Sequence, residues 1–205
     1  MNKTKRISFL GLLIAIEVIL VFTPLGYIPI GPLRATTLHI PVIFAGIAFG
    51  VKEGALLGFI FGLSSLIINT ISPTITSFVF SPFITIGENS GNFASVFIAF
   101  GPRILIGVVS GTAFRFLLNK FKNENVAVII SSLLGALVNT LFVLFLIYLF
   151  FGKVYASSIN ISYSILIRYL FGIITTNGIL EAVVGAIIVL AIYKALHKQI
   201  KKLSR

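Results

Sequence analysis

Long runs of apolar residues, separated by short polar or proline-rich segments, constrain the fold of this chain more than any other feature of its sequence. A helix that crosses a bilayer needs about 20 mostly apolar residues, and the chain of 205 residues contains several runs of that kind. Hydrophobic residues make up 58% of the chain and charged residues 10%, and a soluble domain of this size could not bury so much apolar surface. The sequence therefore predicts an integral membrane protein.

The apolar runs predict six transmembrane helices in a single domain over residues 1–205. The last run, 165–196, would be about 48 Å long as one helix, which is too long for a single crossing. We therefore expect Thr175-Thr-Asn-Gly178 to break or kink it, with a short outer helix before the span. No small-residue cleavage site follows the first run, which favours a retained helix over a signal peptide. The expected fold is an all-α membrane bundle with long ordered outer loops, and its spans lie at about 7–22, 38–50, 54–71, 93–118, 126–151 and 173–193.

The distribution of Lys and Arg predicts the orientation of the bundle. With the N-terminus inside, only four of the 16 basic residues fall at the outer side or outer helix ends: Arg34, Arg103, Lys153 and Arg168. Basic residues gather on the cytoplasmic side of membrane proteins, and an even number of spans then places both termini in the cytoplasm. The net charge of +11 thus indicates topology and contact with anionic lipid heads. A nucleic-acid surface would need a clustered basic face with stacking aromatic residues.

Two long outer segments, 23–37 and 72–92, stand out between the predicted helices. The second one combines hydroxyl residues with closely spaced apolar side chains, among them Phe78, Phe80 and Phe83. A solvated loop would not carry these side chains, so we expect them to be buried against the bundle or over a ligand. Long ordered loops are usually lids or binding loops, and we favour a lid over a plug without a ligand.

The rare residue types exclude several classes of chemistry. The chain has no Cys and no Asp, and its Glu residues show no catalytic spacing. His39 and His197 lie on different predicted segments, and no P-loop, zinc-protease or hydrolase motif occurs. We therefore expect neither an enzyme nor a metal or cofactor site.

Charged residues at membrane depth are costly and often functional. Arg103 lies about a third of the way into its predicted span, where it could pair with Glu17 or Glu181, bind an anionic solute, or extend to the interface. Asn177 and Glu181 are four residues apart and share one helix face, which should point inward. Asn139 is either a contact between helices or a ligand donor.

Two further features have more than one interpretation. His39, beside Thr36 and Thr37 at the start of its helix, is either structural or a ligand contact. Gly11 and Ala15 form a small face on the first helix, which allows another helix to approach closely. That helix could belong to this chain or to a partner.

Four stretches of the sequence, 33–46, 50–62, 77–83 and 102–107, resemble a known family. Together with the short helices, the cytoplasmic termini, the small face and the long outer loops, they resemble the substrate-binding S component of an energy-coupling factor (ECF) vitamin transporter. The resemblance covers nearly the whole chain and is strongest to the pantothenate type. It implies a protein of the bacterial cell membrane.

The resemblance also implies a mechanism and partners. An S component binds one vitamin in an outward-facing pocket beneath its outer loops. It docks through an Ala-xxx-Ala motif, here Gly11 and Ala15, on a transmembrane coupling subunit that carries two cytoplasmic ATPases. The bundle then topples in the membrane and releases the vitamin inside. Hydrolysis of ATP would come from these partners.

A pocket for pantothenate needs a cation, or several amide and hydroxyl donors, for its carboxylate and polar groups. The residues that meet this requirement are Arg103, His39, Asn139, Asn177, Ser77, Ser81 and Thr85, with Phe80 and Phe83 closing over the dimethyl end. Riboflavin, folate or another vitamin is the alternative within the family. A small channel or exporter, suggested by the glycine ladders, and a membrane-embedded enzyme with Arg103 and Glu181 as its pair are alternatives outside it.

Overall fold

A computed structural model describes residues 3–30 and 33–204 of the chain. Some side chains within these ranges lie outside the description, and they include several of the basic residues used to predict the orientation. With Arg205, these are Lys3, Lys5, Arg34, Lys198, Lys201 and Lys202.

The described chain is a bundle of helices, as the apolar runs predict. The helices are α1 (Lys3–Val21), α2 (His39–Ala48), α3 (Val51–Ile71), α4 (Phe93–Phe121), α5 (Glu124–Ser158), α6 (Tyr163–Ile173) and α7 (Ile179–Ser204). In the part of the chain that the structure describes, α3, α4, α5 and the continuous helix Tyr163–His197 are long and apolar enough to cross a membrane. The prediction of an all-α membrane bundle is confirmed.

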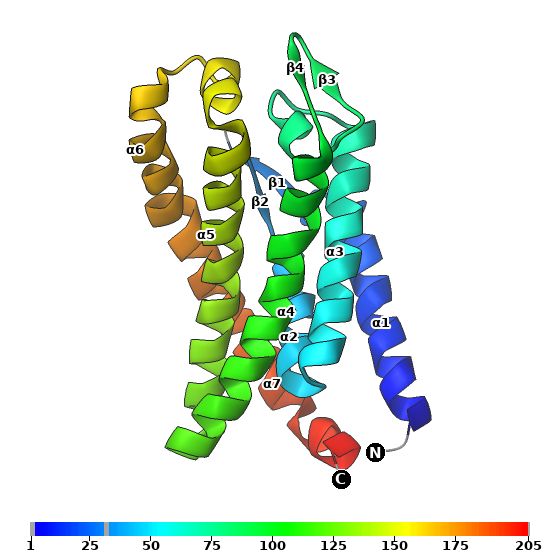
Figure 1. The fold of residues 1–205 in the computed structure, drawn as a ribbon. Helices are drawn as coiled ribbons and strands as arrows, with labels where there is room; N and C mark the ends of the chain where they lie inside the picture. Colours follow the sequence, from blue (N-terminus) through cyan, green and yellow to red (C-terminus); the bar gives the residue numbers. More distant parts are fainter. Residues whose placement is uncertain (1–2, 31–32, 205) are drawn as a thin grey trace.

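The second predicted span, at about 38–50, is the short helix α2. Helix α2 has 10 residues and is therefore about 15 Å long, half of the hydrocarbon core. The residues before it form an antiparallel hairpin, β1 (Tyr27–Ile30) and β2 (Leu33–Thr36), which lies between α5 and α3 in Figure 1. Hydropathy does not predict this hairpin, because Pro29 interrupts the first strand and Gly31-Pro32 separate the two strands.

The predicted break in the last apolar run is a change of helix type. A π-helical turn, Ile174–Gly178, joins α6 to α7 without ending the helix. The hydroxyls of Thr175 and Thr176 donate to the carbonyl oxygen of Gly172 at 3.0 and 2.8 Å. These bonds keep both hydroxyls on the helix itself. The hydrogen-bond pattern of the helix changes at this turn, but the helix continues.

The outer segment between α3 and α4 is ordered. It contains a short 3-10 helix, Ser77–Val79, and a hairpin of β3 (Thr85–Ile86) and β4 (Asn89–Ser90). Figure 1 shows this hairpin at one end of the bundle and both ends of the chain at the other.

Glycines let α2, α3 and α4 pack closely. A methyl group at Gly54 would lie 2.8 Å from the Cα atoms of both Gly107 and Gly46, one on α4 and one on α2. Real Cβ atoms do not approach backbone that closely, so each of these contacts needs glycine. The backbones of the three helices therefore pack directly against one another.

Two hydrophobic clusters fill the bundle at different levels. One includes Phe61 on α3, Ile106 on α4 and Ala136 on α5. The other includes Phe80, together with Ile98 on α4 and Val143 on α5. The level between them, at Arg103 and Asn139, carries the polar residues of the candidate site.

Candidate functional site

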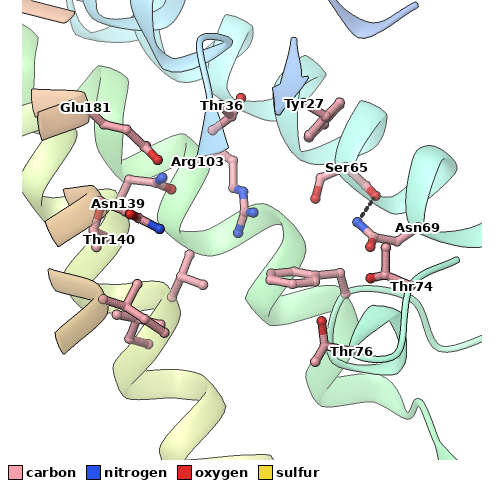
Figure 2. Close-up of a pocket in the computed structure, with 15 residues that line it drawn as sticks. Tyr27, Thr36, Ser65, Asn69, Thr74, Thr76, Arg103, Asn139, Thr140 and Glu181 are labelled. Carbon is pink, nitrogen blue, oxygen red and sulfur yellow. Dashed lines mark hydrogen bonds between the residues drawn. The ribbon is translucent and has the colours of Figure 1, made fainter. Parts of the chain in front are cut away.

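A polar pocket lies between the two hydrophobic clusters. Its cavity volume is about 90 Å³, and part of the pocket is open to solvent. Small-molecule sites usually enclose about 300–1,000 Å³, so this cavity is smaller than a typical site. Helices α3, α4, α5 and α7, the π-helical turn, the β1–β2 hairpin and the loop after α3 all contribute to it (Figure 2). Its lining residues are Tyr27, Thr36, Ser65, Asn69, Thr74, Thr76, Phe80, Arg103, Asn139, Thr140, Val143, Leu144, Ile173, Asn177 and Glu181.

Arg103 is positioned by the proline that precedes it. Pro102 lies inside α4 and has no N–H, so the carbonyl oxygen of Ile98, four residues earlier, loses its usual helical donor. The Nη1 atom of Arg103 donates to this oxygen at 2.8 Å. The side chain thus satisfies a carbonyl that the proline leaves open, and the bond directs the guanidinium along the pocket side of α4.

The guanidinium of Arg103 is buried without a carboxylate partner. Arg103 is only 7% exposed. It forms no ion pair among the described residues, in which Arg6 pairs with Glu53 and His197 pairs with Glu124. Its Nε atom has no hydrogen-bond partner there either. Two aromatic rings lie against it, with Phe61 and Phe80 centroids 5.5 and 5.2 Å from Cζ.

The two carboxylates that could pair with Arg103 differ in location. Glu181 on α7 lines the pocket. Glu17 on α1 is fully buried, does not line the pocket, and has no hydrogen-bond partner for either carboxylate oxygen among the described residues. Glu17 is thus separate from the site.

Amide and carboxylate groups form the wall contributed by α5 and α7. Asn139 is 8% exposed, and its Oδ1 has no partner within the described chain. Figure 2 shows Asn139, Thr140 and Glu181 together on one side of Arg103. Gly178 holds this wall together, because a methyl group there would lie 2.9 Å from Cγ2 of Thr140. The π-helical turn that carries Asn177 therefore packs directly on α5.

The opposite wall consists of residues from α3 and the loop after it. Asn69 donates to the carbonyl oxygen of Ser65 at 2.8 Å and accepts from the hydroxyl of Ser77 at 2.7 Å. The same Ser77 hydroxyl accepts from the backbone N–H of Thr74 at 2.8 Å. Figure 2 shows Ser65, Asn69, Thr74 and Thr76 on this side. The hydrogen bonds fix the loop over α3 and place two threonines at the pocket.

The structure brings together some of the residues proposed from sequence and leaves others elsewhere. Phe80, Arg103, Asn139 and Asn177 all line the pocket, together with Glu181. The remaining candidates lie outside its lining, and each has another environment.

Four of these remaining candidates belong to the outer segment 72–92. Ser77 bonds to Asn69, and Ser81 lies 2.7 Å from the hydroxyl of Thr70, so both attach the loop to α3. Thr85 lies 3.1 Å from the hydroxyl of Ser90 in the β3–β4 hairpin. Phe83 is 75% exposed and does not line the pocket.

His39, the fifth, is buried at the start of α2 against α7. It is 3% exposed, and a methyl group at Gly185 would lie 2.6 Å from its Nε2 atom. It packs against the helix that carries Glu181 but does not line the pocket. Among the described residues, no group of three His, Cys, Asp or Glu could hold a metal ion.

Several pocket residues were not singled out from sequence. Ser65 and Asn69 are four apart in an apolar span, the same signal that identified Asn177 and Glu181. Thr140 directly follows Asn139. Tyr27 and the other threonines lie in outer segments, where polar residues are ordinary, so no sequence signal distinguishes them.

Comparison with known proteins gives consistent matches over the whole chain. The family described as "ECF transporter, substrate-specific component" matches residues 5–193. The pantothenic acid transporter PanT of Lactococcus lactis subsp. cremoris is 35% identical over 201 residues, covering 96% of each chain. The pantothenate transporter PanT of Leuconostoc mesenteroides subsp. mesenteroides is 33% identical over 199 residues, covering 93% of this chain and 91% of its own.

A solved structure shares the fold. The S component for biotin from an ECF-type ABC transporter matches with a TM-score of 0.51 and 23% identity, over 95% of this chain and 94% of that one. At this identity the likeness concerns the arrangement of the helices and not the ligand.

Proposed function

Because the chain belongs to the family of substrate-specific components of ECF transporters, we propose that it binds pantothenate in the pocket around Arg103. Members of this family are vitamin-binding subunits of membrane importers and not enzymes, and they work with an ECF module. The assignment of pantothenate draws on the names of the two relatives, each at least 33% identical over nearly the whole chain.

One observation carries the proposal: a buried arginine, which has no carboxylate partner among the described residues, lines a polar pocket. Pantothenate has a carboxylate at one end, an amide in the middle, and two hydroxyls with a dimethyl group at the other. A buried cation favours an anionic ligand, because charge-assisted hydrogen bonds are the strong ones. Arg103 would receive the carboxylate.

The rest of the pocket suits the rest of this ligand. Asn139 and Asn177 offer amide donors and acceptors for the ligand amide, and Glu181 offers acceptors for the hydroxyls of the ligand. Val143, Leu144 and Ile173 supply apolar surface for the dimethyl group. Phe80 would cover the carboxylate end instead of the dimethyl end.

Delivery into the cell requires partners, and α1 is the helix we propose for docking. Gly11 and Ala15 are both exposed, and nothing lies within 4 Å of the position that a methyl group at Gly11 would take. The small face therefore remains available for another helix. We propose that it contacts a transmembrane coupling subunit that carries two ATPases, with both termini of this chain in the cytoplasm.

A vitamin panel tests the substrate. Purified protein in detergent would be titrated by calorimetry with pantothenate, riboflavin, folate and biotin. We expect saturable heat with pantothenate alone. Tight binding of another vitamin, with no heat from pantothenate, would contradict the assignment. Co-purification of ATPase subunits would separate an importer component from a channel that acts alone.

A further inference from the structure

The guanidinium of Arg103 contacts two phenylalanine rings that come from different parts of the chain. Phe61 belongs to α3 and is fully buried, and Phe80 belongs to the outer loop and is 8% exposed. Their ring centroids lie 5.5 and 5.2 Å from Cζ of Arg103, within the range of cation–π contacts. We call Phe61 and Phe80 the aromatic clamp.

We propose that the aromatic clamp takes the place of a counter-ion and holds Arg103 as an unpaired cation, so that the pocket prefers an anionic ligand. Phe61 and Phe80 are positioning residues in this account. The inference rests on the proposed function, because the anion it requires is the carboxylate of pantothenate.

Aromatic rings beside Arg103 affect its charge and its hydrogen-bond donors differently from a carboxylate. A buried arginine in a membrane protein usually pairs with a carboxylate or with backbone carbonyls. A carboxylate would neutralise the guanidinium and compete with an anionic ligand for its N–H groups. The negative face of a ring attracts the cation but leaves its net charge and its donors in place.

The hydrogen-bond donors of Arg103 are consistent with a cation that is held by rings and remains free to bind an anion. A guanidinium has about five N–H donors in a fixed plane. Nη1 donates to the carbonyl oxygen of Ile98, whereas Nε has no partner among the described residues. The backbone bond and the rings restrain the group, and unused donors remain for a ligand carboxylate.

The clamp also joins the outer loop to the binding site. The backbone N–H of Phe80 donates to the carbonyl oxygen of Ser77 at 3.0 Å, and the Ser77 hydroxyl donates to Asn69 of α3. The Phe61 ring is fixed by its burial in α3, whereas the Phe80 ring depends on the loop. A loop out of place would thus leave Arg103 with one ring instead of two.

The test compares pantothenate with pantothenol, in which a neutral hydroxymethyl group replaces the carboxylate. We expect Phe61→Leu and Phe80→Leu each to raise the Kd for pantothenate roughly 10-fold and to leave the Kd for pantothenol within about twofold. Phe80→Tyr keeps the ring and should keep the wild-type ratio of the two Kd values. Phe59→Leu is the matched control, since Phe59 is on the same helix but 48% exposed.

Equal losses for both ligands in both leucine variants would overturn the inference, because simple core packing acts on both ligands alike. The wild-type titration is read separately. If wild-type protein does not bind pantothenate, the proposed function fails, and the clamp is then decided by a second measurement.

This second measurement needs no ligand. Melting temperatures of ligand-free wild type, Phe80→Leu, Arg103→Gln and the double variant form a double-mutant cycle. We expect Phe80→Leu to lower the melting temperature more in the wild-type background than in Arg103→Gln, because only the former has the cation. Equal shifts in the two backgrounds would contradict a cation–π contact whatever the substrate is.

Discussion

Arg103 owes its place in the pocket to its immediate neighbours in the sequence. Pro102 frees the carbonyl oxygen of Ile98, and the arginine side chain occupies it at 2.8 Å. The sequence shows that Arg103 is a charged residue in an apolar span. It does not show that the side chain of Arg103 bonds to its own helix. That bond depends on the side-chain rotamer, which no sequence pattern reports.

The first prediction concerns the charge of Arg103. We expect Arg103→Gln to weaken pantothenate binding by about 2–3 kcal/mol, or roughly 30- to 150-fold in Kd, because it removes a charged hydrogen-bond donor to the carboxylate. Calorimetry with pantothenate and pantothenol measures this effect. An unchanged Kd for pantothenate would remove Arg103 from the binding site.

Hydroxyl residues are the hardest candidates to place from sequence. The sequence predicts Ser77 and Ser81 as ligand contacts, whereas in the structure they lie outside the pocket lining and bond to Asn69 and Thr70 of α3. A hydroxyl in a loop can bond to the protein as readily as to a ligand, and composition does not distinguish the two. Arg103, Asn139 and Asn177 were easier to find because polar residues in apolar spans are rare.

Helix α4 lacks one backbone hydrogen bond at Pro102 and has in its place the bond from Arg103 to the carbonyl oxygen of Ile98. The second prediction is that Pro102→Ala restores an N–H that competes with Arg103 for the carbonyl oxygen of Ile98. We expect the melting temperature to stay the same or rise, while the Kd for pantothenate increases several-fold. Both are measured on purified protein, by thermal unfolding and by calorimetry.

Gly101→Ala provides the control for this experiment. A methyl group at Gly101 would meet only the Phe97 ring, at 3.9 Å, so it raises helix propensity without a new donor near Ile98. If Pro102→Ala and Gly101→Ala change the Kd alike, the account of the freed carbonyl is wrong.

The π-helical turn between α6 and α7 is the second element that shapes the site. Its position agrees with the predicted interruption at 175–178, although the helix does not end there. The Thr and Gly residues of this stretch indicate an irregularity in the helix but do not identify its type. The type depends on packing, because Gly178 sits against Thr140 of α5.

The third prediction tests this contact. Gly178→Val should push the π-helical turn away from Thr140, because even its Cβ atom would lie 2.9 Å from Cγ2 of that residue. We expect a loss of pantothenate affinity, measured by calorimetry. Gly172→Val is the matched variant on the same helix, where nothing lies within 4 Å of the added Cβ, and it should bind normally. Equal effects from both variants would mean that helix propensity, and not the contact with α5, is responsible.

At the scale of the whole molecule, hydropathy predicted the bundle because membrane spans need long apolar runs. Hydropathy does not predict the hairpin β1–β2, since this hairpin depends on local backbone pairing. We propose that two different regions of the chain serve ligand binding and partner docking. The polar pocket lies between the two hydrophobic clusters, and the small face of α1 remains exposed.

The fourth prediction separates these two tasks. Gly11→Leu combined with Ala15→Leu should abolish co-purification with the ECF module and vitamin uptake by cells, because bulky side chains prevent close helix approach. Binding of pantothenate to the isolated protein should not change. Gly172→Leu, also an exposed glycine replaced by leucine, should retain both properties. Retained co-purification in the double variant would place the docking surface elsewhere.

In the proposed mechanism, the unpaired cation of Arg103 receives the carboxylate of pantothenate. The most direct measurement is a high-resolution structure of the protein with pantothenate bound. We predict that a carboxylate oxygen lies about 2.7–2.9 Å from a guanidinium nitrogen of Arg103, with the rings of Phe61 and Phe80 still against that group. A bound pantothenate whose carboxylate points to Glu181 and Asn177, or which lies outside this pocket, would contradict the account.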